Sequence, residues 1–260
     1  MKKLIVLLND YPGTGKSTLA RCFSRFLNQY GAAQQFASLV EDAEEGPADG
    51  ELRLDANYLT PMGFMDLLDR SPITILEVAT GMGNFFSRFY QNHGLDHALA
   101  DSGVATSVVL PVTSDSDSFD SVIEAAEVYS DHVEYLIAHL ITSSYEDDDK
   151  VWDTSYAARV MDMFEAVELH IPEITFQVEL ELRNQHLDLA EALQTPDAEE
   201  RLGKDFGKWL KRVMLQVDST RQYLFGDAFK PLTAPKSERK TRGPKPKART
   251  DVKASAQAAA

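Results

Sequence analysis

The sequence predicts an α/β fold, in which a mostly parallel sheet is flanked by helices and a disordered basic tail follows. Three observations carry this prediction. Short apolar runs alternate with amphipathic segments along residues 1–225, as a parallel sheet with helices on its faces requires. The first apolar run leads through a glycine-containing turn into a helical pattern. From about Gly226 the composition shifts to Pro, Lys, Arg, Ser and Ala.

The expected strands are short apolar runs rich in β-branched residues. They cover residues 4–8, 36–40, 73–78, 107–112 and 135–141. Helical patterns lie between them, because apolar residues recur there every three to four positions. These patterns cover residues 17–30, 62–70, 95–100, 118–129 and 155–167, and a pair of helices follows at 176–193 and 198–223. We find no internal repeat and expect one domain over residues 1–225.

The net charge of −15 is unevenly divided along the 260 residues. After residue 229, nine Lys and Arg oppose two acidic residues, a net charge of +7, which leaves −22 for residues 1–229. Such an acidic body does not bind nucleic acid over its general surface, since that binding depends on neutralising phosphates. The tail of residues 226–260 has almost no large apolar residue after Leu232, so nothing offsets the entropy of ordering it. We therefore expect a disordered tail and assign any DNA contact to it.

The sequence indicates a reducing, cytoplasmic location. The single Cys22 cannot form an internal disulfide and is expected in the core of a helix. The opening apolar run stops at Asn9, which makes it too short for the core of a signal peptide. No apolar run approaches the ~18 residues of a membrane span.

The stretch LIVLLNDYPGTGKSTLARCF predicts a phosphate-binding loop between a buried strand and a helix. Backbone N–H groups in such a turn and at a helix N-terminus converge on an anion, which the helix dipole also favours. Lys16 would then reach the β- and γ-phosphates of a nucleotide, and the Ser17 hydroxyl would bind Mg²⁺. Asp10 replaces the first glycine of the pattern G-x-x-x-x-G-K-[ST], so the motif diverges at one position. The expected cradle consists of Gly13, Thr14, Gly15, Lys16, Ser17 and Thr18.

This opening resembles that of ParA/MinD-type P-loop ATPases, including the relatives found in plasmid partition, stability and conjugative-transfer operons. The stretch ITILEVATGMG resembles the family's Walker B strand and turn, and ATSVVLPVTSDSDSFDSV resembles its next strand and helix. The resemblance covers about residues 1–195. It implies a P-loop NTPase fold with ATP and Mg²⁺ as ligands, and hydrolysis of ATP to ADP and phosphate.

The resemblance also implies roles for particular residues. Glu77 stands where the family usually has Asp and keeps a carboxylate for the Mg²⁺ shell. Either Glu41 or Asp42, in SLVEDAE, would orient the attacking water, and the sequence leaves both open. Tyr11 occupies the place of a signature lysine that reaches the partner's phosphates in the family's dimer. These departures predict weaker ATP-driven dimerisation and argue against fast hydrolysis.

The function implied is a nucleotide switch in plasmid partition or stability, or in conjugative DNA transfer. Its expected partners are a DNA-binding protein or relaxosome component, a second copy of the chain and, through the tail, DNA. A small-molecule or nucleotide kinase and an ATP-binding adaptor with little hydrolysis are the alternatives. Kinases commonly shield the transferring group with arginines on lids, and residues 89–149 contain no Lys or Arg. Arg159 and Arg183 are the arginines left for that role.

Overall fold

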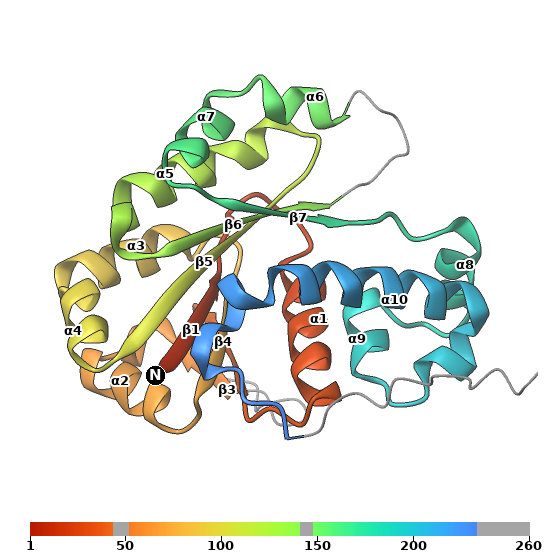
Figure 1. Cartoon of the computed structure of the whole chain (residues 1–260), viewed down its shortest axis with the longest axis horizontal. Coiled ribbons are helices and arrows are strands. Elements are labelled where there is room, and N and C mark those ends of the chain that lie inside the picture. Colours follow the sequence, from red (N-terminus) through yellow and green to blue (C-terminus); the bar gives the residue numbers. More distant parts are fainter. Residues whose placement is uncertain (44–51, 141–147, 233–260) are drawn as a thin grey trace, which may run out of the picture.

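The computed structural model describes residues 1–43, 52–140 and 148–232 (Figure 1). Its centre is one sheet of seven parallel strands. The strands are β1 (Lys2–Leu7), β2 (Gln35–Val40), β3 (Leu52–Asp55), β4 (Ile73–Val78), β5 (Val104–Val112), β6 (Glu134–Leu140) and β7 (Val167–Ile171). Their order in the sheet is β3-β2-β4-β1-β5-β6-β7, which confirms the predicted α/β fold class.

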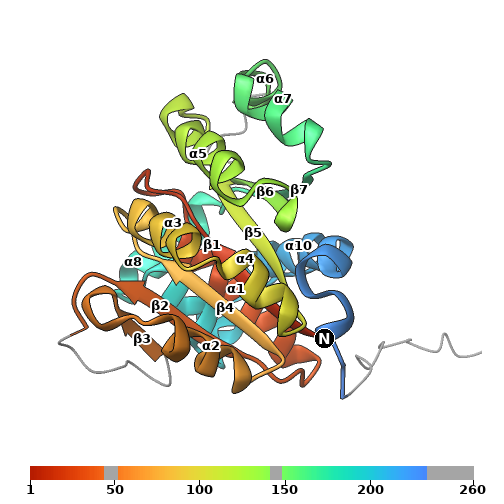
Figure 2. The ribbon, with the colours of Figure 1, turned by 90° about the vertical axis from the view of Figure 1, so that its left-hand side faces the viewer.

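Helices cover both faces of the sheet and make a three-layer molecule (Figures 1 and 2). One face carries α2 (Pro61–Asp69), α3 (Gly83–Asn92), α4 (Leu95–Asp101), α5 (Asp120–Tyr129), α6 (Asp148–Asp153) and α7 (Tyr156–Met163). The other face carries α1 (Lys16–Gln29), α8 (Phe176–Asn184), α9 (Leu189–Gln194) and α10 (Ala198–Phe225). Each face therefore has its own apolar core, with the sheet between them.

Five elements differ from the sequence prediction, and one of them is the short helix α6, which no helical pattern predicted. The edge strands β3 and β7 were not predicted, because each is short and mixes apolar with polar residues. Helix α3 was also not predicted, since it follows the Gly-rich turn after β4. The helix expected over residues 176–193 is two helices, α8 and α9, because His186 between them has a left-handed φ of 54°.

The central strand β1 is buried on both sides. Leu4 and Val6 pack into the core under α2 to α7, and Ile5 and Leu7 pack into the core under α1 and α10. Strands buried on both faces are typical of parallel sheets and read as continuous apolar runs. The residues that follow β1 therefore start from a rigid position at the carboxyl edge of the sheet.

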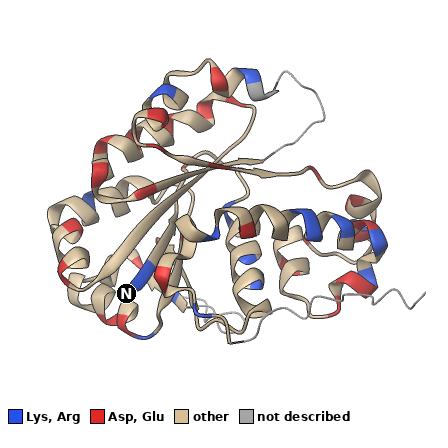
Figure 3. Cartoon of the chain, in the orientation of Figure 1, with Lys and Arg blue, Asp and Glu red and all other residues tan. Residues whose placement is uncertain are grey.

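The described chain packs beyond the end of α10. Phe229 contacts the rings of Phe26, Tyr30 and Phe225, and the Leu232 amide donates a hydrogen bond to the Tyr30 carbonyl. Of the predicted tail, residues 233–260 lie outside the described residues. In the part that the structure describes, no helix is long and apolar enough to cross a membrane. Acidic side chains are spread over the helices of both faces, whereas many of the Lys and Arg lie on α1 and α10 (Figure 3).

Candidate nucleotide site

Two glycines shape the loop that joins β1 to α1. Gly15, immediately before the helix, has φ of 72°, and a Cβ there would collide with the side chain of Leu140 from β6. Gly13 has φ of 78°, but nothing lies within 4 Å of where its Cβ would be. Glycine adopts this left-handed region without the penalty of a side chain. The loop thus packs closely against β6 at Gly15 and stays open to solvent at Gly13.

The N-terminus of α1 is free to receive an anion. Its first helical hydrogen bond runs from the Leu19 amide to the Gly15 carbonyl, so the amides of Lys16, Ser17 and Thr18 have no acceptor inside the helix. The first turn contains no acidic residue that would neutralise the helix dipole. A cavity of about 470 Å³ lies over these amides. The residues that line it are Gly13, Thr14, Gly15, Lys16, Ser17, Thr18, Glu77, Ala79, Thr80, Asp188, Leu189 and Ala190.

Lys16 is held in this cavity as a buried cation. It is 6% exposed, and its Nζ donates to the Asn9 carbonyl and, at 3.0 Å, to Thr80 Oγ1. Burial lowers the pKa of Lys16, while the carboxylates of Glu77 and Asp10 oppose that shift. Two neutral oxygens satisfy the ammonium group only in part, and a phosphate oxygen is a stronger, charge-assisted acceptor.

The two predicted magnesium ligands meet across the cavity. Ser17 Oγ donates to Glu77 Oε1 at 2.5 Å, which joins the start of α1 to the end of β4. Thr14 Oγ1 is buried with no hydrogen-bond partner among the described residues. Hydroxyl and carboxylate oxygens are the donors that Mg²⁺ prefers, so the residues fit this ion.

Asp10, the residue that replaces a glycine of the motif, ties the loop to its neighbours. Its Oδ1 accepts the amides of Gly81 at 3.0 Å and Gly83 at 2.9 Å, at the start of α3. Its own amide donates to Ser121 Oγ on α5 at 3.0 Å. A Cβ on Gly83 would lie 2.6 Å from Asp10 Oδ2, so the carboxylate needs glycine opposite it. Asp10 therefore caps a helix that comes later in the sequence.

Tyr11 bends toward the end of β5. Its hydroxyl donates to Asp115 Oδ2, and its amide donates to Asn9 Oδ1 at 2.8 Å. The hydrogen bond from Tyr11, followed by that from the Asp117 amide, lowers the pKa of Asp115. The same contact raises the pKa of Tyr11. The phenol thus has an acceptor within its own chain.

The two candidate water-orienting carboxylates lie outside the cavity. Glu41 and Asp42 follow β2 at the carboxyl edge of the sheet, both are exposed, and neither lines the space over the phosphate loop. The carboxylate found there besides Glu77 is Asp188, whose Oδ1 accepts the Glu191 amide at 2.7 Å and so caps α9. Sequence reasoning missed Asp188, because no local pattern brings a residue so late in the chain to the first loop.

A second cavity, of about 430 Å³, adjoins the first through Ser17, Glu77, Ala79, Asp188 and Ala190. Two arginines that sequence reasoning missed line it, Arg21 on α1 and Arg53 on β3. Arg159 lies instead over the Tyr156 ring on α7, and Arg183 pairs with Glu179 on α8. Neither of these two lines the cavities at the phosphate loop.

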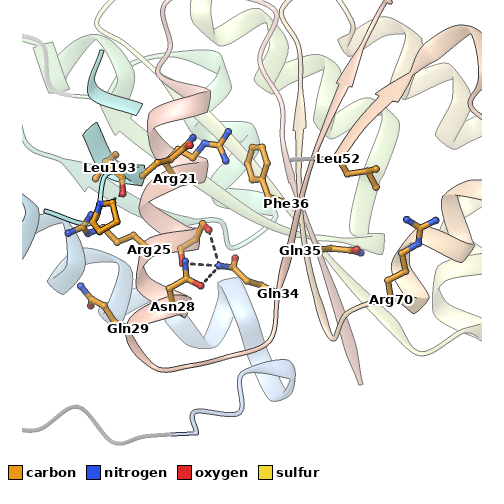
Figure 4. A pocket seen from close by; sticks show the side chains of 13 residues that line it. Arg21, Arg25, Asn28, Gln29, Gln34, Gln35, Phe36, Leu52, Arg70 and Leu193 are labelled. Atoms are coloured by element: carbon orange, nitrogen blue, oxygen red, sulfur yellow. Dashed lines mark hydrogen bonds between the residues drawn. The ribbon is translucent and has the colours of Figure 1, made fainter. Parts of the chain in front are cut away.

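A larger cavity of about 870 Å³ lies farther along α1 (Figure 4). Its polar side chains bond to one another and to the backbone: Gln34 donates to Ser24 and Asn28, and Arg25 donates to the Leu193 carbonyl at 2.9 Å. The Arg21 guanidinium stacks over the Phe36 ring at 3.9 Å. Because these groups hold α1 against α9 and β2, we place the nucleotide site at the smaller cavity over the loop.

No family model and no curated protein sequence matches the chain. MinD of Aquifex aeolicus is 15% identical over 82% of this chain and 96% of its own, with a TM-score of 0.43. McdA of Cyanthece, in its apo form, is 14% identical over 82% of this chain and all of its own, with a TM-score of 0.43. The MinC:MinD cell division protein complex of Aquifex aeolicus is 13% identical over 82% of this chain and 96% of its own, with a TM-score of 0.41. The chain has the P-loop NTPase fold, because a Gly-Lys-Ser loop joins the central strand of its parallel sheet to α1.

The role of Asp10 can be tested with a graded pair of substitutions. Asp10→Ala removes the acceptor for two amides at the start of α3, and we expect it to lower the free energy of unfolding by about 1 kcal/mol, as loss of a helix cap does. Asp10→Asn keeps one acceptor oxygen and should lose less. Urea unfolding followed by circular dichroism measures both. Equal stability of Asp10→Ala and the wild type would contradict the assigned role.

Proposed function

We propose that this chain binds ATP with Mg²⁺ at the phosphate loop and acts as a slowly hydrolysing nucleotide switch of the ParA/MinD type. One observation carries the proposal: Lys16, Ser17 and Glu77 converge on a cavity lined by helix N-terminal amides that have no acceptor inside the helix. A strand-to-helix turn without a ligand has no need to bury a lysine there. Phosphate binding explains the arrangement.

Different groups of the chain would bind the phosphates and the Mg²⁺ ion. The amides of the loop hold the phosphates, and Lys16 stabilises charge on the β- and γ-phosphates. Ser17 and Glu77 would hold Mg²⁺, directly or through water. When bound, Mg²⁺ neutralises charge on the phosphate oxygens. Burial of Lys16 strengthens its contact with phosphate, because charges interact more strongly at low dielectric.

We expect slow hydrolysis because the carboxylates that would orient the attacking water are exposed. Asp42 and Glu41 stay the candidates for orienting the attacking water, and both are exposed at the end of β2. A group that must reach inward from an exposed position is poorly preorganised for this task. At the extreme, the chain would be an ATP-binding adaptor with little turnover.

The process we propose is plasmid partition or stability, or conjugative DNA transfer, in the cytoplasm. The support is the resemblance of residues 1–195 to ATPases of such operons, together with the basic segment after residue 229. A DNA-binding protein or relaxosome component is the proposed partner, and a homodimer is the proposed assembly. Tyr11 donates to Asp115 within its own chain, which favours dimer contacts that do not run through this position.

A P-loop kinase is the second candidate. Arg21 and Arg53 line the cavity that adjoins Ser17 and Glu77, where an anionic acceptor would have to lie near the transferring phosphate. The two functions differ in one measurement. Release of inorganic phosphate from ATP without any added acceptor supports the switch, whereas release only with an acceptor supports the kinase.

Lys16→Ala tests the nucleotide site against a matched control. The variant should lose about 10- to 100-fold in MgATP affinity by calorimetry, because one charge-assisted contact to phosphate is removed. Lys3→Ala is the control: Lys3 is 4% exposed at the opposite end of β1, where it pairs with Glu134. It should bind MgATP as the wild type does. Equal affinity of wild type and Lys16→Ala would refute the site.

The tail can be tested by truncation after Leu232, which leaves the packing of Phe229 intact. The full chain should bind nonspecific duplex DNA weakly, with a log-log salt slope that grows by about 0.9 for each phosphate contacted. The truncated chain should not bind. Fluorescence anisotropy at several salt concentrations measures both. If the two chains bind equally, or neither binds at low salt, the tail has no role with DNA.

A further inference from the structure

Two histidines and a glutamate form a cluster on the outer strands of the sheet. His139 on β6 is paired in register with His170 on β7, and Glu168 lies two residues before His170. Side chains two apart on a strand share a face, so all three lie on the face covered by α6 and α7, where β6 and β7 run side by side (Figure 1). None of these three residues lines the cavity over the phosphate loop.

The ligand atoms of the cluster are close together. One nitrogen from each histidine and one oxygen of Glu168 all lie within 4.8 Å of one another. His139 Nε2 is 3.5 Å from Glu168 Oε2. Ligand atoms around a tetrahedral Zn²⁺ are separated by about 3.3 Å, given bonds of about 2.0 Å. The His139–Glu168 spacing is already near this value.

The cluster contains a buried nitrogen whose bonding is incomplete. His139 is 7% exposed, and its Nε2 has no hydrogen bond of normal geometry among the described residues. Buried polar atoms normally have a partner. The atom is directed at Glu168, so an ion between the two would complete its bonding.

Neighbouring side chains hold the carboxylate in place. Trp152 Nε1 on α6 donates to Glu168 Oε1 at 3.0 Å, which leaves Oε2 facing His139. The indole also packs edge-on against the His139 ring, at 5.3 Å between centroids. The Trp152 N–H therefore fixes which carboxylate oxygen faces His139. Hydrogen bonds of this kind fix the orientation of metal ligands.

We propose that His139, Glu168 and His170 bind a divalent transition-metal ion of the Zn²⁺ class. Two imidazoles and one carboxylate suit such ions, whereas Mg²⁺ and Ca²⁺ take oxygen ligands. Three protein ligands leave one coordination position open, and it faces solvent because Glu168 and His170 are only partly covered. This site is independent of the nucleotide site and of the proposed function.

Zinc titration of the chelator-treated full chain tests this proposal, with calorimetry for affinity and elemental analysis for stoichiometry. We expect one Zn²⁺ per wild-type chain and a melting temperature that rises on its addition. His170→Ala and Glu168→Gln should each weaken binding by at least about tenfold and abolish the thermal shift. Glu168→Gln keeps an acceptor for Trp152, so it changes the ligand with little change in packing.

His132→Ala is the matched control. His132 is a half-exposed histidine beside Asp96 on the surface, away from the cluster, so its loss should leave zinc affinity unchanged. Circular dichroism checks that each variant is folded. Absence of zinc binding by the wild type, or unchanged affinity in both His170→Ala and Glu168→Gln, would overturn the proposal and leave His139 and Glu168 as neighbours without a metal.

Discussion

The buried side chain of Asn9 holds the phosphate loop in place, and the rest of the site depends on it. Asn9 is fully buried, and its Nδ2 donates to the carbonyls of Pro111 and Ser118 at 2.8 and 2.9 Å. Its Oδ1 accepts the Tyr11 amide, and its main-chain carbonyl accepts Lys16 Nζ. A buried amide with all its partners is rigid, because loss of any one bond leaves a costly unsatisfied group. One residue therefore joins the end of β1 to the end of β5 and to Lys16.

Asp10 and Tyr11, the two unusual residues of the motif, also hold the loop against neighbouring strands. Asp10 binds the turn after β4, and Tyr11 binds the turn after β5. Phosphate loops generally rely on glycine flexibility at the first position, whereas here side chains anchor the loop to both neighbouring strands. A preorganised loop binds its anion without first losing conformational entropy. The divergence from the motif is thus compatible with tight phosphate binding. At Asp10 and Tyr11, side chains that anchor the loop replace the usual flexibility.

Local patterns in the sequence predicted the centre of this structure well. The apolar runs at β1 and β4 form strands, and the Gly-Lys-Ser turn leads into α1, as the sequence predicts. Ser17 bonds to Glu77, and the binding of Mg²⁺ by this pair stays a prediction. Long-range partners were not predictable. Gly81, one partner of Asp10, is 71 residues away, and Asp188 approaches from α9. Neither relation leaves a periodic signal in the sequence. The edge strands were missed for another reason: exposure on one side removes the continuous apolar run by which buried strands are recognised.

We propose that the loop held by Asn9, Asp10 and Tyr11 is the phosphate site. The most direct measurement is a crystal structure of the chain with Mg²⁺ and a non-hydrolysable ATP analogue. We expect the triphosphate to lie against the amides of residues 13–18 and to contact Lys16, while Asn9 stays bonded to Pro111 and Ser118. A nucleotide bound instead in the cavity beside Arg25 and Gln34, or a loop that releases Asn9 to admit the phosphates, would contradict it.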